Sequence, residues 1–326
     1  MSELRQDLVS GDWIILSPER ANRENLSKII KKKKRSKTPI SKCPFEDLKK
    51  SGNYPLIFSY PNEKKWQIVI FQNKYPALRH NGVCAKKNKV GPFTTMTGVG
   101  HHDLLVTRDH NKDFSRLSNK LAFLVFKTLK EYINNIKKDR CLSYISFFHN
   151  FGALAGATID HPHYQIIALP IVPPDVNSSL TGSWRYFKEH KSCIHCQMIK
   201  FEKEQKKRII FEDNNVIAFS PFFSKEPFEV RIFPKKHLSS FEATDDKMLM
   251  AVSSALKIVL QKINKNLNFP DYNFFIHTAP IKGDYHYYHW HIEVLPKLSF
   301  VGGFELGTGV NINIVDPDLA AEILNK

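Results

Sequence analysis

The chain has 326 residues, of which 42% are hydrophobic and 12% aromatic, and its formal net charge is +16. This length and composition indicate a soluble globular protein with one large or two smaller domains. No apolar run approaches the roughly 20 residues that a membrane span needs, and the N-terminus lacks the apolar segment of a secretory signal, so we expect no membrane association and a cytoplasmic location.

The excess of basic residues raises the question of which anions the protein binds. Lysines and arginines can neutralise the phosphates of nucleic acids. Here most of them are lysines scattered among Asn and Ile residues, without a single basic stripe interleaved with aromatics. We therefore expect small phosphorylated substrates as partners, and no nucleic acid.

The first predicted element is a short strand at residues 12–16, which leads into a turn that contains Arg20 and Arg23. Two arginines three residues apart can both present a planar guanidinium to a phosphate. We expect them to bind the phosphates of a nucleotide; the alternative is a pair of ordinary solvated arginines. The lysine run at residues 31–37 predicts a solvated loop.

Strands alternate with one long helix in the rest of the first half. Apolar runs predict strands at residues 66–71, 102–107 and 144–148. Apolar residues at near-helical spacing predict an amphipathic helix from residue 118 to residue 138. We expect Asn73, just after the first of these strands, to belong to a nucleotide site.

The most informative stretch is Asp-His-Pro-His-Tyr-Gln at residues 160–165, which an apolar run follows. Alternate side chains of a strand point to one face, so His161, His163 and Gln165 should project together. One imidazole can then attack phosphorus while neighbouring polar groups hold the phosphoryl oxygens. The alternative is a pair of surface histidines on an edge strand.

A loop rich in Gly and Ala precedes this strand, at residues 150–158. Small residues let backbone N–H groups approach a phosphate closely. We expect Asn150, Gly152 and Thr158 to contribute to phosphate binding. A Gly-rich loop alone is weak evidence, but one that leads into a His-x-His-x-Gln strand is stronger.

The second half of the chain repeats the order of the first. After a Cys-x-x-Cys, the sequence predicts strands, a long helix and a last strand that precedes a second His-x-His, at residues 216–219, 228–233, 246–266 and 273–277. The spacing from His110 to His161 is nearly the same as that from His237 to His289. We infer two copies of one α+β unit, residues 1–180 and 181–326, whose antiparallel sheets can join into one.

The duplication also sorts candidate metal ligands into two sets. Two thiolates and two imidazoles suit tetrahedral zinc in a closed, structural site, and the second half offers Cys193, Cys196, His237 and His289. The equivalent set in the first half is Cys43, Glu46, His110 and His161.

The first-half set differs from the second because Glu46 replaces a cysteine. A carboxylate can ligate zinc, but Asp47 or a water can equally complete the site, and a weaker or absent metal is a further alternative. The two remaining cysteines, Cys84 and Cys141, are expected to be free thiols.

The two His-x-His strands should differ in activity. The amide of Gln165 can donate to and accept from phosphoryl oxygens, whereas Glu293 in the second strand repels a phosphate. The chemistry is therefore expected at His163. Near the C-terminus, the Gly-rich segment at residues 299–309 predicts a close-fitting loop that holds a sugar, with Glu305 accepting hydrogen bonds from vicinal hydroxyls. Residues 316–325 predict a short closing helix.

The His-x-His-x-Gln strand, the loop before it and the repeated Cys and His sets resemble the galactose-1-phosphate uridylyltransferase family, the transferase branch of the histidine-triad superfamily. The resemblance extends over nearly the whole chain. It implies the histidine-triad fold for both units, an α+β architecture of antiparallel sheets with packed helices. It also implies His163 as the nucleophile and His161 as a metal ligand.

Further expectations follow from the same resemblance. The family reacts by double displacement: a nucleotide sugar loses sugar 1-phosphate to form a nucleotidyl-histidine, and a second sugar phosphate or orthophosphate takes the nucleotide. A Gly-aromatic-Glu segment contacts the hexose, often in the partner subunit, which implies Phe304, Glu305 and Asn311 as sugar contacts and a homodimer. Tyr164 stands where many members have Gly, which could alter the fit of the substrate.

The same motifs are also similar to those of ADP-glucose phosphorylases, which transfer adenylyl groups. We expect uridylyl transfer from UDP-glucose to a hexose 1-phosphate in galactose metabolism, because this is the commoner activity of the family. One alternative is an adenylyltransferase that uses phosphate as the acceptor. The other is a non-catalytic nucleotide-binding sensor.

Overall fold

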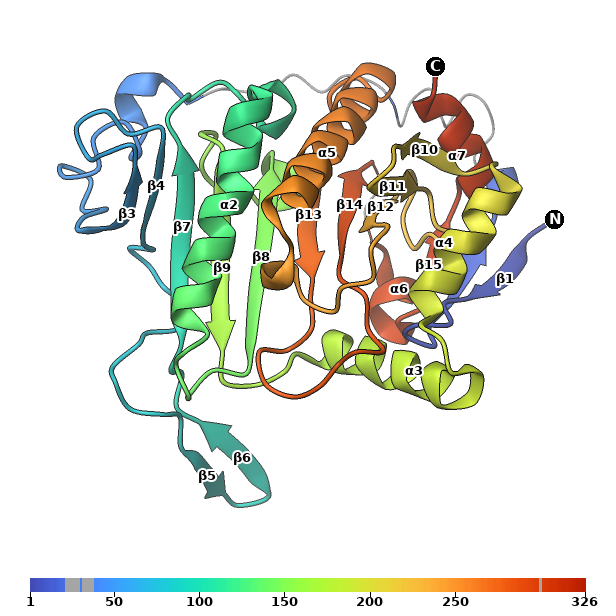
Figure 1. Ribbon diagram of the computed structural model, residues 1–326, viewed down its shortest axis with the longest axis horizontal. Coiled ribbons are helices and arrows are strands. Elements are labelled where there is room, and N and C mark those ends of the chain that lie inside the picture. The colour runs from blue at the N-terminus through green and yellow to red at the C-terminus, as the bar shows by residue number, and fades with distance from the viewer. Residues whose placement is uncertain (21–29, 31–37, 299–300) are drawn as a thin grey trace.

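The computed structural model describes residues 1–20, 30, 38–298 and 301–326 (Figure 1). Arg23, the lysine run and the first two residues of the Gly-rich C-terminal segment lie outside the described residues.

One antiparallel sheet of ten strands runs through the described part of the chain, in the order β10-β11-β12-β14-β13-β8-β9-β7-β4-β3. The first half of the chain supplies β3 (Leu56–Tyr60), β4 (Ile68–Gln72), β7 (His101–Thr107), β8 (Tyr144–Phe151) and β9 (His163–Leu169). The second half supplies β10 (Ile209–Glu212), β11 (Val216–Phe219), β12 (Val230–Pro234), β13 (Asp271–His277) and β14 (His291–Lys297). Strands β8 and β13 pair antiparallel in the middle, with Phe148 opposite Phe275, and so join the two halves.

Two long helices, α2 (Asn119–Ile136) and α5 (Asp246–Asn266), lie side by side on one face of this sheet (Figure 1). Each begins at a capping side chain: Ser118 accepts the N–H of Leu121, and Asp245 accepts the N–H of Met248. The strand order of the second half mirrors that of the first, and each half places its helix before its last two strands. The predicted α+β fold of duplicated histidine-triad-like units is therefore confirmed. The division after residue 180, a position within α3, stays a prediction.

The alternation of residues along β9 determines which side chains lie on each face of the sheet. Tyr164, Ile166 and Ala168 are fully buried in the core beneath α2 and α5. His163 and Gln165 alternate with them and so point to the opposite face, which we call the far face of the sheet. The side chain of Tyr164, stacked on Phe147, therefore lies on the other side of the sheet from that of His163.

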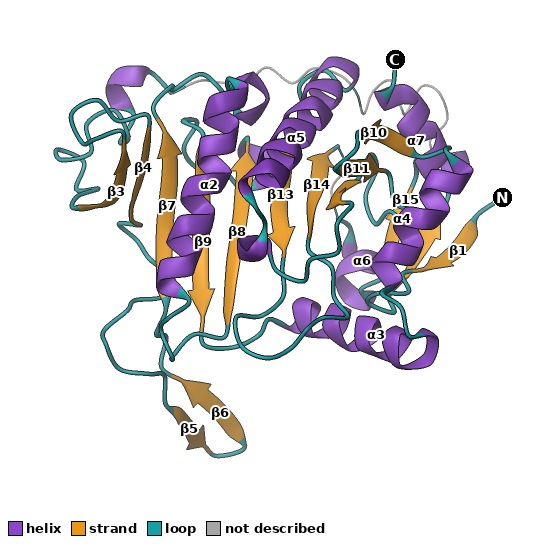
Figure 2. Ribbon diagram, in the orientation of Figure 1, coloured by secondary structure: helices purple, strands orange, loops and turns teal. Residues whose placement is uncertain are grey.

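Several smaller elements complete the described part of the fold, and of these only the strand Trp13–Leu16 and the helix Pro317–Leu324 were predicted from the sequence. Besides the ten-stranded sheet there are a three-stranded sheet of β1 (Glu3–Gln6), β2 (Trp13–Leu16) and β15 (Asn311–Asn313), and a protruding hairpin of β5 (Lys87–Val90) and β6 (Phe93–Met96). In the described part of the chain, the other α-helices are α3 (Pro174–His190), α4 (Ile194–Gln205), α6 (Gly303–Thr308) and α7 (Pro317–Leu324), and Figure 2 distinguishes them from the loops. Short 3-10 turns occupy Pro18–Arg20, Ile40–Lys42, Phe114–Arg116, Ala153–Ala155 and Phe241–Ala243.

The expectation of a loop at residues 299–309 is wrong for residues 303–308, which form α6. The carboxylate of Glu305 accepts the backbone N–H of Gly302 at 3.0 Å, which satisfies a donor at the start of the helix. Gly309, at a φ of +73°, ends the helix in the left-handed conformation that glycine adopts readily.

The expectation of free thiols at Cys84 and Cys141 is also wrong, because the two cysteines form a disulfide. The loop before β5 folds back onto the connection between α2 and β8, which brings their Cα atoms to 4.9 Å across 57 residues of sequence. That proximity arises from tertiary structure and leaves no signal in the spacing of the cysteines. Among the described residues, no helix is both long and apolar enough to cross a membrane.

Candidate active site and metal clusters

His163 stands at the start of β9 with its imidazole 6% exposed. Its Nδ1–H donates to the backbone oxygen of His161 at 2.9 Å, which leaves Nε2 without a proton. Burial lowers the pKa of His163, so the ring is neutral near pH 7. A neutral imidazole with a free lone pair on Nε2 is the chemical form that attacks phosphorus.

Gln165 is held by a histidine that the sequence analysis did not single out. The backbone N–H of Ala77 donates to His102 Nδ1 at 3.0 Å, so the proton of this ring lies on Nε2. That Nε2–H donates to Gln165 Oε1 at 3.0 Å. Because the amide oxygen is engaged, the NH₂ group of Gln165 is the part available to an anion. Asn73 lies beside this pair, with its Nδ2 3.1 Å from His102 Nε2.

A second buried histidine, His149 on β8, supports the backbone of the same strand. Its Nδ1–H donates to the backbone oxygen of His163 at 2.7 Å. Burial lowers the pKa of His149 to about 3, which keeps the ring neutral. Neither His102 nor His149 belongs to a motif, and only the pairing of β7, β8 and β9 brings them to this position.

The Gly/Ala-rich loop packs against β13. Asn273 Nδ2 donates to Asn150 Oδ1 and to the backbone oxygen of Ala155, both at 2.8 Å. Gly152 has a φ of +87°, and a Cβ there would lie 2.2 Å from the Asp271 carboxylate, so a larger residue would be strained and would displace that side chain. Thr158 is exposed, later in the same loop.

The first-half metal set comes together as expected. The Nε2–H of His161 donates to the backbone oxygen of Thr107 at 2.7 Å, so Nδ1 is unprotonated; it lies 3.5 Å from Cys43 Sγ and 3.4 Å from Glu46 Oε1. His110 Nδ1 is also 3.4 Å from Glu46 Oε1, and it is buried without a hydrogen-bond partner among the described residues.

All four ligand atoms of this set lie within 4.8 Å of one another. An orphaned buried nitrogen facing a thiol and a carboxylate fits a bound cation. Glu46, rather than Asp47, faces this cluster.

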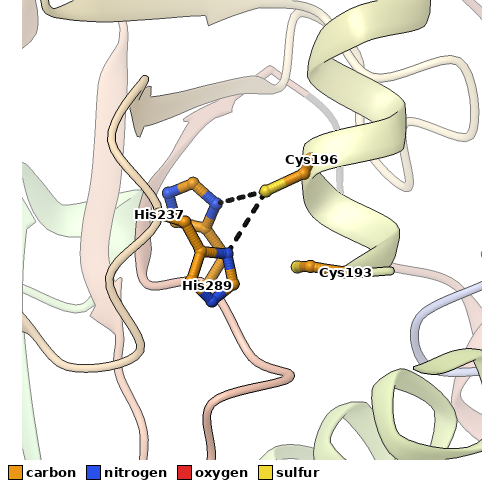
Figure 3. Close-up of side chains that lie close together, drawn as sticks. All are labelled: Cys193, Cys196, His237 and His289. Carbon is orange, nitrogen blue, oxygen red and sulfur yellow. Dashed lines mark hydrogen bonds between the residues drawn. The ribbon is translucent and has the colours of Figure 1, made fainter. Parts of the chain in front are cut away.

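The second-half set is shown in Figure 3 and is equally compact, with ligand atoms within 4.8 Å. Cys196 Sγ on α4 lies 3.2 Å from His237 Nδ1 and 3.6 Å from His289 Nδ1, and Cys193 caps the start of the helix. Hydrogen bonding by the Cys196 thiol lowers the pKa of Cys193, against the effect of burial. Two sulfurs and two imidazoles in this arrangement fit a closed tetrahedral metal site.

Comparisons with known proteins agree with this geometry. Residues 79–326 match the family described as "Domain of unknown function (DUF4921)". The sequence is 36% identical over 330 residues to ADP-glucose phosphorylase from Arabidopsis thaliana, covering 99% of this chain and 92% of that protein.

The chain belongs to the family of galactose-1-phosphate uridylyltransferases and ADP-glucose phosphorylases. The galactose-1-phosphate uridylyltransferase of Thermotoga maritima is 27% identical over 337 residues, covering 100% of this chain and 98% of that protein. The crystal structure of the Arabidopsis ADP-glucose phosphorylase with bound ADP-glucose superposes with a TM-score of 0.84 at 35% identity, over 100% of this chain and 99% of that one. The protein is thus a nucleotidyltransferase of this family.

Not all the expected site residues of this family member lie together. Arg20 ends the 3-10 turn after β2 and is exposed. Asn311 on β15 pairs with the same strand, β2, and Phe304 and Glu305 lie on α6. In Figure 1, α6 and β15 are separated from β9 by β8, β13 and β14. Within one chain, the expected sugar contacts are therefore distant from His163.

Proposed function

We propose that this family member is an ADP-glucose phosphorylase, which transfers the adenylyl group of ADP-glucose to orthophosphate through His163. The observation that best supports nucleotidyl transfer is the unprotonated Nε2 of buried His163. The 2.9 Å hydrogen bond from Nδ1 fixes this tautomer, and Gln165 lies on the same face of the strand. The choice of ADP-glucose rests on the 36% identity to the Arabidopsis phosphorylase over nearly the whole chain.

In the first step, Nε2 of His163 attacks the α-phosphorus of ADP-glucose. An N–P bond forms while the bond from the α-phosphorus to the bridging oxygen breaks, and glucose 1-phosphate leaves with the bond electrons. The NH₂ group of Gln165, whose oxygen is held by His102, donates to a non-bridging oxygen as negative charge builds there. Backbone N–H groups of the loop with Asn150, Gly152 and Thr158 are proposed to hold the same phosphoryl group, and Arg20 and Arg23 the diphosphate.

In the second step, an oxygen of orthophosphate attacks the same phosphorus. The N–P bond breaks, its electrons return to Nε2 of His163, and ADP is released. The imidazole regains its neutral form, so the net reaction converts ADP-glucose and phosphate into ADP and glucose 1-phosphate without an oxidant or a further co-reactant.

Zinc is the metal that we propose for the two Cys and His clusters. Cys193, Cys196, His237 and His289 would hold it in a closed site that stabilises the second half. Cys43, Glu46, His110 and His161 would hold it in the first half. Zinc there would fix the His161 ring, whose backbone oxygen accepts the Nδ1–H of His163 and so sets the tautomer of the nucleophile.

We further propose a cytoplasmic homodimer. The separation of Phe304, Glu305 and Asn311 from β9 within one chain supports a dimer in which these residues contact the sugar bound at the partner's His163. The substrates are a nucleotide sugar and a phosphate or sugar phosphate, both small anions that suit a chain with a net charge of +16.

A second candidate is uridylyl transfer from UDP-glucose to galactose 1-phosphate by the same two steps. It is supported by the 27% identity to the Thermotoga uridylyltransferase over the whole chain.

Steady-state assays with two pairs of substrates test these proposals. ADP-glucose with orthophosphate should release glucose 1-phosphate with a kcat/KM at least about 10-fold above that for UDP-glucose with galactose 1-phosphate. The reverse preference would move the protein to the second candidate. Turnover of neither pair, with nucleotide binding still detectable, would favour the non-catalytic sensor. The His163→Ala protein serves as the matched control in each assay.

A further inference from the structure

A third cluster of metal-binding side chains lies apart from the two Cys and His sets. His80, His101 and Asp139 place their ligand atoms within 4.8 Å of one another. They come from three separate segments: the loop before β5, the first residue of β7 and the connection between α2 and β8. We propose that these residues form a site for a divalent transition-metal ion such as zinc, with an open coordination position.

The distances within the cluster fit ligands around an ion better than they fit hydrogen bonds. Asp139 Oδ2 lies 3.2 Å from His80 Nδ1 and 3.9 Å from His101 Nε2. Ligand atoms about 2.1 Å from a tetrahedral zinc lie about 3.4 Å from each other. Yet Asp139 Oδ2 is buried and has no hydrogen-bond partner among the described residues, although two imidazole nitrogens face it. With both imidazoles neutral, no cation among the described residues faces this buried oxygen, and a bound metal ion would supply one.

The surrounding contacts hold these ligands in place. The backbone N–H of Cys141 donates to Asp139 Oδ1 at 2.8 Å and so directs Oδ2 toward the histidines. The rings of His80 and His101 stack with centroids 4.7 Å apart and planes at 15°, so the exposed ring of His80 has to turn for both nitrogens to point at one ion. The Cys84–Cys141 disulfide ties the loop of His80 to the segment of Asp139. The three segments are thus joined before any ion binds.

A second carboxylate stands behind one of the proposed ligands. Asp103 Oδ2 lies 3.9 Å from His101 Nδ1, on the side of the ring away from the cluster, and accepts the hydroxyl of Tyr132 at 2.5 Å. A carboxylate behind a metal-bound imidazole is the usual arrangement that orients the ring and raises its basicity.

Two histidines and one carboxylate are ligands typical of zinc and other borderline transition metals, rather than of calcium or magnesium. Three protein ligands leave a fourth position for water, and His80 is 39% exposed, so an ion has access from solvent. A bound ion would also fix the start of β7, whose next residue, His102, donates to Gln165 on the far face of the sheet.

Cobalt binding to the full-length protein, supplied beforehand with two zinc ions per chain for the two Cys and His clusters and freed of excess zinc, tests this proposal. The wild type should bind one Co²⁺ per chain more than His80→Ala and Asp139→Asn, while His190→Ala, which removes an exposed histidine of α3, should match the wild type. The added ion should give the visible d–d bands of a nitrogen and oxygen site, without the sulfur-to-cobalt charge transfer that a Cys cluster would produce. Its binding should raise the Tm of the wild type but not that of the two variants.

The same variants show whether a loss of Co²⁺ binding is caused by a loss of folding. Asn at position 139 can still accept the N–H of Cys141, so Asp139→Asn should unfold in the presence of a chelator at the wild-type temperature, as should His80→Ala. Equal Co²⁺ stoichiometry in all four proteins would overturn the proposal. An added ion that shows sulfur charge transfer would overturn it as well.

Discussion

The two His-x-His strands of this molecule share one backbone arrangement and differ in what faces the second histidine. In the first half, Nδ1 of His163 lies 2.9 Å from the backbone oxygen of His161; in the second half, Nδ1 of His291 lies 3.2 Å from that of His289. The first histidine of each pair belongs to one of the two clusters of candidate metal ligands. The scaffold for a phosphorus nucleophile is therefore present twice.

The two halves differ in the residue two positions after the second histidine, which is Gln165 in the first half and Glu293 in the second. Nε2 of His291 lies 3.3 Å from the carboxylate of Glu293, whose negative charge would repel a phosphate that approaches this nitrogen. Nε2 of His163 faces no carboxylate among the described residues, because Gln165 occupies the equivalent place and its oxygen is engaged by His102.

Buried ion pairs fix the position of the Glu293 carboxylate. Arg231 Nε lies 3.0 Å from Glu293 and 3.0 Å from Glu229 in a buried network. Arg231 and His277 hold the pKa of Glu293 well below its usual range, despite the effect of burial, so this carboxylate stays negative. One copy of the unit thus presents an amide and the other a fixed charge that repels phosphate. We therefore expect this one side chain to determine which of the two strands is reactive.

The largest difference between the two halves is expected when His163 and His291 are each replaced by alanine. His163→Ala should lower kcat by about 10⁴-fold or more, because the covalent step loses its nucleophile. His291→Ala should leave kcat within about 3-fold. Steady-state turnover of both purified variants checks this, with circular dichroism as the folding control. Comparable losses in the two variants would contradict the assignment of the chemistry to the first half.

Exchanging the amide of Gln165 and the carboxylate of Glu293 tests whether the charge at this position affects catalysis. Gln165→Glu should lower kcat by about 10²-fold to 10³-fold, because it removes a donor and adds a negative charge where charge develops. Glu293→Gln should keep wild-type kcat but lose about 1–3 kcal/mol of unfolding free energy, since Arg231 loses one partner. Kinetics and denaturant unfolding of both variants measure these effects, and an active Gln165→Glu enzyme would refute the role of charge.

Removing one metal ligand from each cluster should separate activity from stability. Cys43→Ser should lower kcat about 10-fold to 100-fold, because the histidine that orients His163 loses its metal. Cys196→Ser should mainly lower the Tm and the zinc content by one ion per chain. Elemental analysis, Tm and kcat of the two variants test this. Unchanged zinc content in both would show that neither cluster holds the metal.

The pH dependence of the first chemical step is the smallest expected effect. The attacking imidazole must be neutral, and burial lowers the pKa of His163. The rate of nucleotidyl-enzyme formation should therefore stay constant from pH 8 to below about 6.5, the ordinary histidine value, and fall only at lower pH. Single-turnover kinetics across this range measure the acid limb. A limb centred above pH 6.5 would contradict a buried, neutral nucleophile.

Much of this arrangement could be predicted because it follows from local pattern. The alternation in the His-x-His-x-Gln strand predicts which side chains share a face, and the near-constant spacing of the repeated motifs predicts the duplication. Both sets of metal-binding residues do come together, and Glu46 does occupy the place of a cysteine. The roles of His163, Gln165 and the expected sugar contacts stay predictions.

The features that could not be predicted from the sequence depend on contacts between distant segments. His102 and His149 reach the site only through the pairing of β7, β8 and β9, and the Cys84–Cys141 disulfide only through the packing of two loops. The helices α3 and α4 bury few apolar residues, and the glycines of α6 suggest a loop although Glu305 caps a helix there. Tertiary packing, rather than propensity, decides these elements.

The most direct test of the central claim is to locate the covalent intermediate. The protein is incubated with ADP-glucose, and separately with UDP-glucose, without an acceptor, then digested at neutral or mildly alkaline pH, because phosphohistidine is acid-labile. Peptide mass spectrometry should find the nucleotidyl group on the peptide that contains His163 and none on the peptide that contains His291. A nucleotidyl group on His291, or turnover without any adduct, would contradict the account.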